Sequence, residues 1–218
     1  MDKEDQVGAL QLSVRLRGVS PPVTRRLLIG EQALLVELHS ILQVAFGWSD
    51  DHLYTFQIRG WQFGDPSRAL QLALSGGGVD IPLAAFELEI GEGFRYEYNL
   101  SIPWEVDCRV EARGLISAAS LVVCLAAGGH PPDEDLPVPS AYPDWFRDSE
   151  PSWALHQIEE LLDEDLDDQG FRSESRDILA RARGLPLTRR AIADRLQLLS
   201  GNGWDAGGLY ENAGPVGH

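Results

Sequence analysis

The alternation of apolar and polar residues is the feature that most constrains the fold of this chain. Side chains of a β-strand point alternately to opposite faces, so a period of two predicts a strand with one buried face. Residues 9–17 follow this period closely. Residues 23–29, beyond a turn that contains Pro21 and Pro22, predict a second strand that pairs with the first as a hairpin. The alternating apolar residues of the first strand are Leu10, Leu12, Val14 and Leu16.

The same alternation returns further along the chain, and one helical pattern interrupts it. Residues 34–46 carry apolar side chains three and four positions apart and stop at Gly47, which predicts an amphipathic helix. We therefore expect an α+β fold: a mixed, mostly antiparallel sheet with a packed helix, followed by C-terminal helices. The further predicted strands are residues 52–58, 60–66, 94–98 and 104–112.

The second half of the chain predicts a domain followed by an extension. Six prolines between residues 131 and 151 predict a covering loop without regular structure. Glycines are frequent from residue 201 to the end, which predicts a mobile tail. We expect one α+β domain at residues 8–180 and a helical extension with the glycine-rich tail at residues 181–218. The predicted C-terminal helices are residues 153–166, 173–183 and 188–199, the last capped by Thr188.

Acidic residues dominate the charge of the chain, and they are concentrated in one segment. The sequence has 34 acidic and 18 basic residues, a formal net charge of −16, which opposes a broad phosphate-binding surface. Residues 133–168 carry 13 acidic residues and one basic residue, Arg147. This segment predicts either a solvated helix end or a surface that attracts a basic partner.

The remaining composition favours a cytoplasmic protein without a metal or cofactor. No apolar run approaches the roughly 20 residues that a membrane-spanning helix needs, and the first residues lack the pattern of a secretory signal. Cys108 and Cys124 are too few for a disulfide framework, and we expect both to be buried thiols.

Several segments resemble, in the same order, the plasmid pRiA ORF-3-like family. The resemblance covers about residues 8–180 and implies a small α+β protein of a kind carried by plasmids and transposons. Some members are labelled resolvases, but nothing here marks a nucleophilic serine with arginines around it. The matching segments are Gly18-Val19-Ser20-Pro21-Pro22-Val23-Thr24-Arg25-Arg26, Leu38-His39, Gly47-Trp48-Ser49-Asp50-Asp51-His52-Leu53-Tyr54-Thr55-Phe56, Phe63-Gly64-Asp65-Pro66, Phe94-Arg95-Tyr96-Glu97-Tyr98 with Trp104, and Gly129-His130-Pro131-Pro132-Asp133-Glu134-Asp135.

The chain departs from the family pattern mainly at polar positions. The family's Gly-Asp pair before Trp104 is replaced by Ser101 and Ile102, and its second histidine after His52-Leu53 is replaced by Tyr54. His130 stands where the family has the first of two cysteines. Loss of polar groups from a retained fold implies a divergent member that serves as a binding scaffold.

Two alternatives to a binding protein stay open at this point. One is a metal-dependent or hydrolytic enzyme built on His52, Asp65, Cys124 and His130, although the spacing is not that of a zinc site and no catalytic motif occurs. A candidate pocket would then contain His52, Tyr54, Asp65 and Trp104. The other is a DNA-binding accessory protein that uses Arg25 and Arg26, with Arg15 and Arg17, on the first hairpin.

The sequence favours a non-enzymatic binding or adaptor protein over these alternatives. We expect it to dock a basic protein partner through an acidic surface with an aromatic neighbour, and we expect no catalytic residue, metal or nucleic acid. The oligomeric state stays open. The predicted contact residues are Asp133, Glu134, Asp135, Trp145, Asp163, Glu164, Asp165, Asp167 and Asp168.

Overall fold

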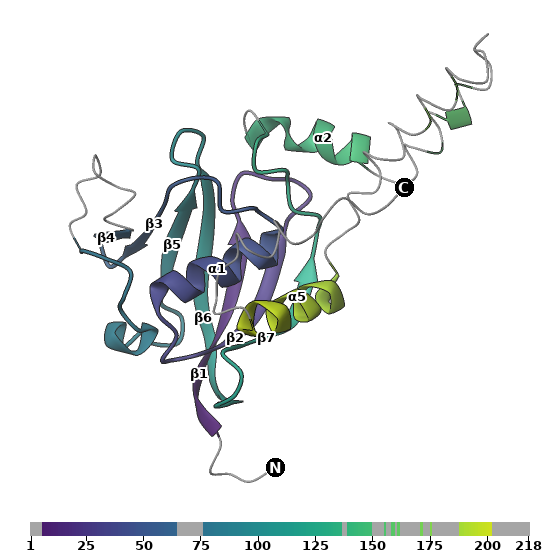
Figure 1. Cartoon of the computed structure of the whole chain (residues 1–218). Coiled ribbons are helices and arrows are strands. Elements are labelled where there is room, and N and C mark those ends of the chain that lie inside the picture. The colour runs from purple at the N-terminus through teal and green to yellow at the C-terminus, as the bar shows by residue number, and fades with distance from the viewer. Residues whose placement is uncertain are drawn as a thin grey trace.

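The chain forms one antiparallel sheet with helices packed on it (Figure 1). The computed structural model describes residues 6–64, 76–136, 139–149 and 188–201, with the single positions 155, 158, 159, 161, 171 and 175. Seven strands are ordered β4-β3-β5-β6-β1-β2-β7, and all paired strands are antiparallel. The predicted α+β class is confirmed. The strands are β1 (Gln6–Leu16), β2 (Thr24–Gly30), β3 (Tyr54–Ile58), β4 (Trp61–Gly64), β5 (Gly93–Tyr98), β6 (Trp104–Ser117) and β7 (Val122–Gly128).

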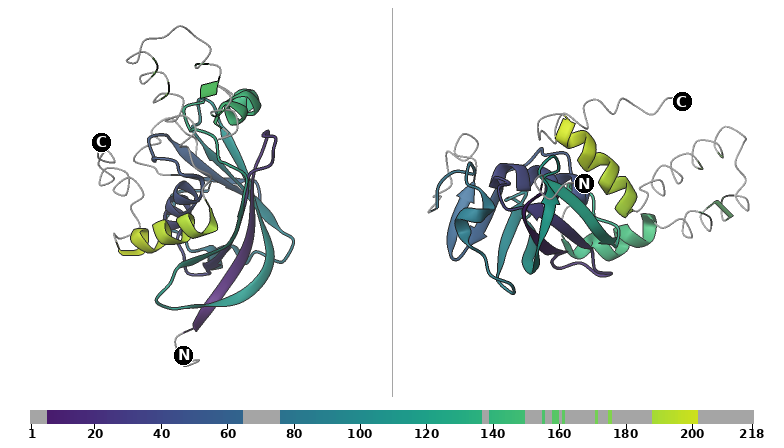
Figure 2. Two further views of the ribbon diagram at one scale, coloured as in Figure 1. Left: turned by 90° about the vertical axis from the view of Figure 1, so that its right-hand side faces the viewer. Right: turned by 90° about the horizontal axis from the view of Figure 1, so that it is seen from below.

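The alternation seen in the sequence separates an inner face from an outer face of the sheet. Leu12 and Val14 of β1 are buried, whereas Ser13 and Arg15 between and beyond them face outward. Figure 2 shows helices α1 (Leu35–Phe46) and α5 (Arg189–Gly201) on the same side of the sheet. No described helix covers the outer face.

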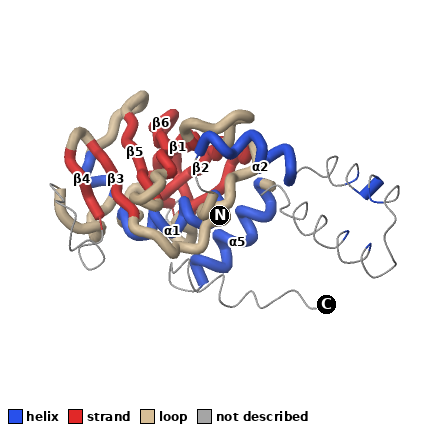
Figure 3. Tube along the Cα trace, turned by 90° about the horizontal axis from the view of Figure 1, so that it is seen from above, coloured by secondary structure: helices blue, strands red, loops and turns tan. Residues whose placement is uncertain are grey.

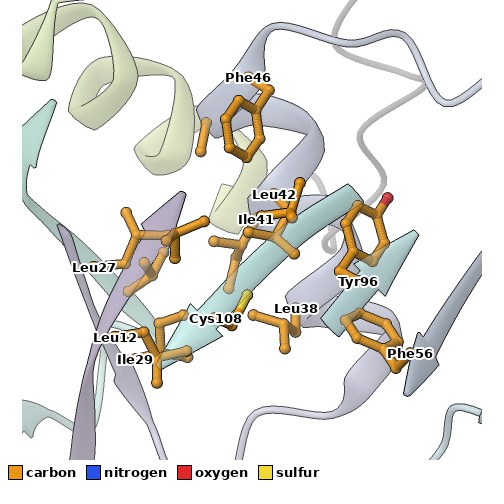
Figure 4. Close-up of a cluster of buried hydrophobic side chains, with 14 of the residues drawn as sticks. Leu12, Leu27, Ile29, Leu38, Ile41, Leu42, Phe46, Phe56, Tyr96 and Cys108 are labelled. Atoms are coloured by element: carbon orange, nitrogen blue, oxygen red, sulfur yellow. The ribbon is translucent and has the colours of Figure 1, made fainter. Parts of the chain in front are cut away.

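Helix α1 begins and ends where the sequence predicts. The backbone N–H of Leu34 donates a hydrogen bond to Glu37 Oε2 at 2.8 Å, which satisfies one group at the helix start. Gly47 ends the helix with a φ of 73°, a left-handed conformation that glycine adopts without strain. Leu38, Ile41 and Leu42 point from α1 onto the sheet and form the centre of the core in Figure 4.

Helix α5 packs against β7 and lies beside α1 (Figure 3), so residues beyond the predicted domain contribute to the same core. Its buried side chains are Ile192, Leu196 and Leu199. The predicted cap is confirmed, because the N–H of Ala191 donates to Thr188 Oγ1 at 3.2 Å. The boundary at residue 180 and the glycine-rich tail beyond residue 201 lie outside the described residues, as do almost all of the two preceding predicted helices.

Two predictions about local structure were wrong or incomplete. The proline-rich stretch is not an irregular loop throughout, because it contains helices η3 (Pro139–Ala141) and α2 (Tyr142–Ser149). Pro143 lies in the first turn of α2, where a missing N–H costs no hydrogen bond. Strand β7 was not predicted.

A further short helix, η2 (Leu83–Phe86), precedes β5. No helix in the described part of the chain has the length and hydrophobicity to span a membrane.

Candidate functional site

Loop 131–136 lies across the end of the sheet and is held there by aromatic side chains. The indole N–H of Trp48 donates to Pro132 O at 3.1 Å, and that of Trp104 donates to Glu134 O at 3.1 Å. Both indoles are fully buried, and Trp48 stacks on Tyr98 with ring centroids 5.1 Å apart. Two indole donors leave the loop backbone little freedom, because breaking either bond would leave a buried donor unpaired.

Glu134 is turned into the protein and fastens the same loop from within. Its side chain is 9% exposed and accepts hydrogen bonds from the N–H of Ser49 at 2.7 Å and from the hydroxyls of Ser49 and Tyr98. Burial, followed by the neighbouring Glu134, raises the pKa of Tyr98, so this phenol stays a proton donor. The expectation that Glu134 belongs to an exposed acidic surface is therefore corrected.

Asp133 and Asp135 flank Glu134 and project in the opposite sense, into solvent. Asp133 is exposed, and its Oδ1 accepts the N–H of Asp135 at 3.0 Å, which stabilises the turn. The Asp135 side chain is 79% exposed and lies 3.2 Å from His52 Nε2. Of the predicted acidic surface, these two carboxylates are brought together on one rigid loop. Asp163, Glu164, Asp165, Asp167 and Asp168 lie outside the described residues.

Trp145, the aromatic residue of the predicted surface, lies on α2 close to the start of loop 131–136. Its ring is half-buried between His130, at 5.2 Å, and Tyr142, at 5.8 Å. The Tyr142 hydroxyl donates to His130 O at 2.6 Å and joins α2 to the loop. The loop and α2 thus form one continuous end of the molecule, here called the loop end and defined by residues 130–136 and Tyr142–Ser149.

The predicted pocket of His52, Tyr54, Asp65 and Trp104 does not form as expected. His52 and Trp104 both lie near Tyr98. The His52 ring meets the Tyr98 ring edge-on, with centroids 5.5 Å apart, and the Trp104 indole donates to loop 131–136. Tyr54 and Trp104 are buried and fill the core instead of lining an opening. Asp65 lies outside the described residues.

A buried polar cluster surrounds His39, which was not among the predicted site residues. His39 Nε2 lies 2.8 Å from Asp50 Oδ1, and Nδ1 lies 2.7 Å from the Tyr96 hydroxyl. Gln43 Nε2 donates to the same hydroxyl at 2.8 Å, and the imidazole stacks on Tyr54 with centroids 3.6 Å apart. The order of carboxylate, imidazole and hydroxyl resembles that of a catalytic triad.

This cluster cannot reach a substrate, because its hydroxyl is sealed inside the protein. Tyr96 is fully buried, and burial raises its pKa well above the ordinary value, so the phenol stays protonated. A nucleophile must be exposed to the atom that it attacks. The cluster therefore fastens α1 to β5, and the signal for it in the sequence was a histidine inside the apolar stripe of the helix.

Arg25 was predicted to lie on a DNA-binding hairpin, and the structure places it inside the protein. Its side chain is 2% exposed, and its Nε donates to Ala45 O at 2.7 Å, at the C-terminal end of α1. Nη1 donates to Thr24 O at 2.7 Å and to Gly128 O at 2.8 Å. Burial lowers the pKa of Arg25 to about 10. The side chain joins α1, β2 and β7 and cannot touch DNA.

The described residues of the alternative metal or hydrolytic site, which are His52, Cys124 and His130, do not assemble either. Cys124 is buried on β7 with a pKa raised by burial, and His130 Nδ1 lies 2.7 Å from Pro131 O. Cys108 is also a buried free thiol. Within the described residues, no group of three or more histidine, cysteine or acidic side chains is placed to hold a metal ion.

The outer face of the sheet carries a feature that the sequence did not reveal. An open groove of about 570 Å³ lies over β3, β5 and β6. It is here called the outer groove and is lined by Gln57, Gly60, Gly91, Gly93, Phe94, Arg95, Asp107, Cys108 and Arg109. Its polar side chains come from strands that meet only in the folded sheet, so nothing in the linear sequence brings them together.

Comparisons with known proteins agree with this architecture. A family model described as plasmid pRiA4b ORF-3-like protein matches residues 8–174. The uncharacterised protein y4hQ of Sinorhizobium fredii is 31% identical over 137 residues, which cover 61% of this chain and 69% of that protein. The crystal structure of the protein of unknown function MM3350 from Methanosarcina mazei Go1 is similar in fold, with a TM-score of 0.56, 19% identity, and coverage of 73% of this chain and 91% of that one. Neither relative is described by an activity.

Proposed function

Since the chain belongs to the plasmid pRiA4b ORF-3-like family, a family of uncharacterised function, we propose from its own geometry that it is a non-catalytic binding protein of the cytoplasm. Its loop end docks a basic protein partner. The observation that carries this proposal is the rigid presentation of Asp133 and Asp135 by a loop whose backbone and central carboxylate are fixed from inside. The association with plasmids and transposons that the resemblance implies stays a prediction.

Rigidity matters because binding costs less when the contact residues are already ordered. A flexible acidic loop would lose conformational freedom when it met a partner, whereas loop 131–136 has lost that freedom in folding. The inward carboxylate of Glu134 anchors the loop, and the outward carboxylates of Asp133 and Asp135 are exposed to a partner. The outward pair can contact a partner without disturbing the anchor.

The charge of the neighbouring chain favours a basic partner. Residues 133–168 carry 13 acidic residues against one basic residue, and like charges do not neutralise each other within such a segment. Trp145 adds an aromatic side chain at the loop end, and aromatic residues are enriched at the centres of protein interfaces. Charge and aromatic surface together favour a protein partner over a small cation.

The alternatives have less support in the geometry. An enzyme that uses Cys124 as nucleophile would need an accessible thiolate, but burial raises the pKa of this thiol. DNA binding through Arg25 would require an exposed guanidinium, and Arg25 is buried. Its neighbour Arg26 forms an ion pair with Glu111, with 2.6 Å between Arg26 Nε and Glu111 Oε2.

A matched pair of double variants tests the proposal on a partner recovered by cross-linking in cells and then purified. D133N/D135N removes two charges from the loop end but keeps the side-chain oxygens, including the one that accepts the N–H of Asp135. D80N/E89Q removes two exposed charges near the start of β5, at the opposite end of the sheet. We expect D133N/D135N to weaken partner binding by about tenfold at low salt and D80N/E89Q to leave it unchanged.

Salt dependence supplies the second readout. Binding of the unmodified chain should weaken as ionic strength rises, and the D133N/D135N variant should show a shallower dependence because it has lost two contacts. Equal affinities for all three proteins would refute docking through the loop end. Turnover of a substrate that His52→Gln abolishes would refute the non-catalytic role.

A further inference from the structure

We propose that the outer groove is a binding site for a small molecule that carries an oxyanion, a phosphate ester or a polycarboxylate, held between Arg95 and Arg109. The site lies on the face of the sheet opposite α1, so it is separate from the loop end and does not depend on the function proposed there. The groove has a volume of about 570 Å³ and is open, so a bound molecule would keep part of its surface in water.

Glycine at one strand position creates the depression in the sheet. Gly93 of β5 pairs with Arg109 of β6. Because glycine has no side chain, nothing projects from β5 onto the outer face at this position. A Cβ atom added to Gly93 would lie 2.8 Å from Cys108 O, closer than real Cβ atoms approach a backbone oxygen. The turns that border the groove also use glycine, with φ angles of 84° at Gly60 and 94° at Gly91.

Arg95 lines the groove with hydrogen-bonding capacity that the protein does not use. Three carboxylates lie near its guanidinium, but their oxygens are 3.8–4.0 Å from its nitrogens, too far for hydrogen bonds. Its Nε atom is buried and has no hydrogen-bond partner. A buried N–H without an acceptor costs free energy, and a change of side-chain rotamer that turned this N–H toward an oxyanion in the groove would relieve that cost.

Arg109 supplies the second guanidinium from the adjacent strand. Its Nε donates to Gly91 O at 3.1 Å, which fixes the plane of the group at the rim of the groove. Within the described part of the chain its terminal nitrogens form no ion pair. Arginine binds carboxylate and phosphate through parallel N–H donors, so two guanidiniums on neighbouring strands suit a ligand with several such oxygens.

The charges that line the groove also favour an anion. Arg95 and Arg109 contribute two positive charges and Asp107 contributes one negative charge, which leaves one positive charge in a protein whose net charge is −16. Asp107 lies 3.8 Å from Arg95 Nε and 3.5 Å from Arg17 Nε, so its charge is shared with a second arginine. Glu97, Glu105 and Asp107 already supply counter-charges to Arg95, so within the described residues a neutral or cationic ligand would leave only Arg109 without one.

Calorimetric titration of the full chain at low ionic strength tests this site, with pyrophosphate and citrate as separate probes. We expect at least one probe to bind, and R109Q to weaken its affinity by about tenfold through the loss of a charged donor. Within the described residues Arg109 forms no ion pair, and its Nε donates to Gly91 O. R95Q should have a similar effect. R26Q is the matched control, since Arg26 lies on the same face outside the groove.

Each outcome decides the proposal. Binding of pyrophosphate alone identifies a phosphate ligand, binding of citrate alone identifies a carboxylate, and binding of both identifies a general oxyanion site. Absence of binding for both probes would overturn the proposal. Equal weakening by R26Q and R109Q would overturn it as well, since general attraction to the arginines of this face would then explain the result.

Discussion

Arg25 and Arg26 are neighbours on β2, and they show how differently the two faces of the sheet use the same side chain. Arg25 points inward, where carbonyl oxygens from α1, β2 and β7 accept its N–H groups. Arg26 points outward to Glu111. Nε and Nη1 of Arg25 thus have fixed partners within the fold, although its buried Nη2 has none among the described residues. On the outer face Arg26 is paired as closely, whereas the nitrogens of Arg95 lie 3.8–4.0 Å from three carboxylates and its Nε has no hydrogen-bond partner in the described part of the chain.

The comparison predicts its largest difference in stability between these two arginines. Arg25→Met should lower the free energy of unfolding by about 3 kcal/mol, because three carbonyl oxygens lose a charged donor. Arg26→Met should leave it nearly unchanged, since an exposed ion pair contributes little. Chemical denaturation of both variants measures the difference. Equal stabilities would show that the inner face does not depend on its buried cation.

A smaller difference is expected between two adjacent acids of loop 131–136. Glu134→Ala should cost about 2 kcal/mol, because the Tyr98 hydroxyl and the Ser49 N–H lose a charged acceptor. Asp135→Ala removes a largely exposed carboxylate and should change stability little. Thermal unfolding of both variants, with Tyr98→Phe to complete a double-mutant cycle for Glu134, checks this. A larger loss for Asp135→Ala would contradict the inward anchor.

The buried phenols predict a loss of stability at alkaline pH. The effect of any one phenol is smaller than the two differences above. Burial raises the pKa of Tyr142 from 10.0 to about 12. Between these values the unfolded chain has released this proton while the folded chain keeps it, so stability falls as pH rises, by at most about 1.4 kcal/mol per pH unit. The pKa values of Tyr96 and Tyr98 shift in the same direction, whereas Arg25, with its pKa lowered by burial to about 10, acts with the opposite sign.

Tyr142→Phe isolates one contribution from this sum. The variant should show a flatter decline of stability between pH 10 and 12 than the unmodified chain, whatever it loses at neutral pH through the missing bond to His130 O. Urea denaturation at several pH values gives both slopes. Identical slopes would mean that this phenol titrates as it does in the unfolded chain.

The elements with a clear period were predictable from the sequence, and those without one were not. Strand β1 follows its period from Leu10 to Leu16, and helix α1 has the predicted bounds, although all its residues from Leu38 to Phe46 are buried. Strand β7 has consecutive apolar residues from Val122 to Ala127, a run that fits a strand and a buried helix equally well. Helix α2 was missed because proline was taken as a breaker, although it is tolerated in the first turn of a helix.

The functional groups divide in the same way. The inward position of Arg25 was visible in the sequence, since it alternates with Val23 and Leu27 on the apolar side of its strand. The outer groove was not visible, because it depends on the register that places Gly93 opposite Arg109. Register is set by the pairing of whole strands, so residues far apart in the chain gain a common function only in the sheet.

The central claim is that polar side chains on the inner face are structural and that ligands meet side chains on the outside of the fold. The most direct measurement follows the arginine Nε–Hε signals by NMR while the oxyanion that binds in the calorimetric test is added stepwise to the protein. The account predicts that the signals of Arg95 and Arg109 shift with saturation and that the signal of Arg25 stays in place. A shift of Arg25 without a shift of Arg95 or Arg109 would contradict it.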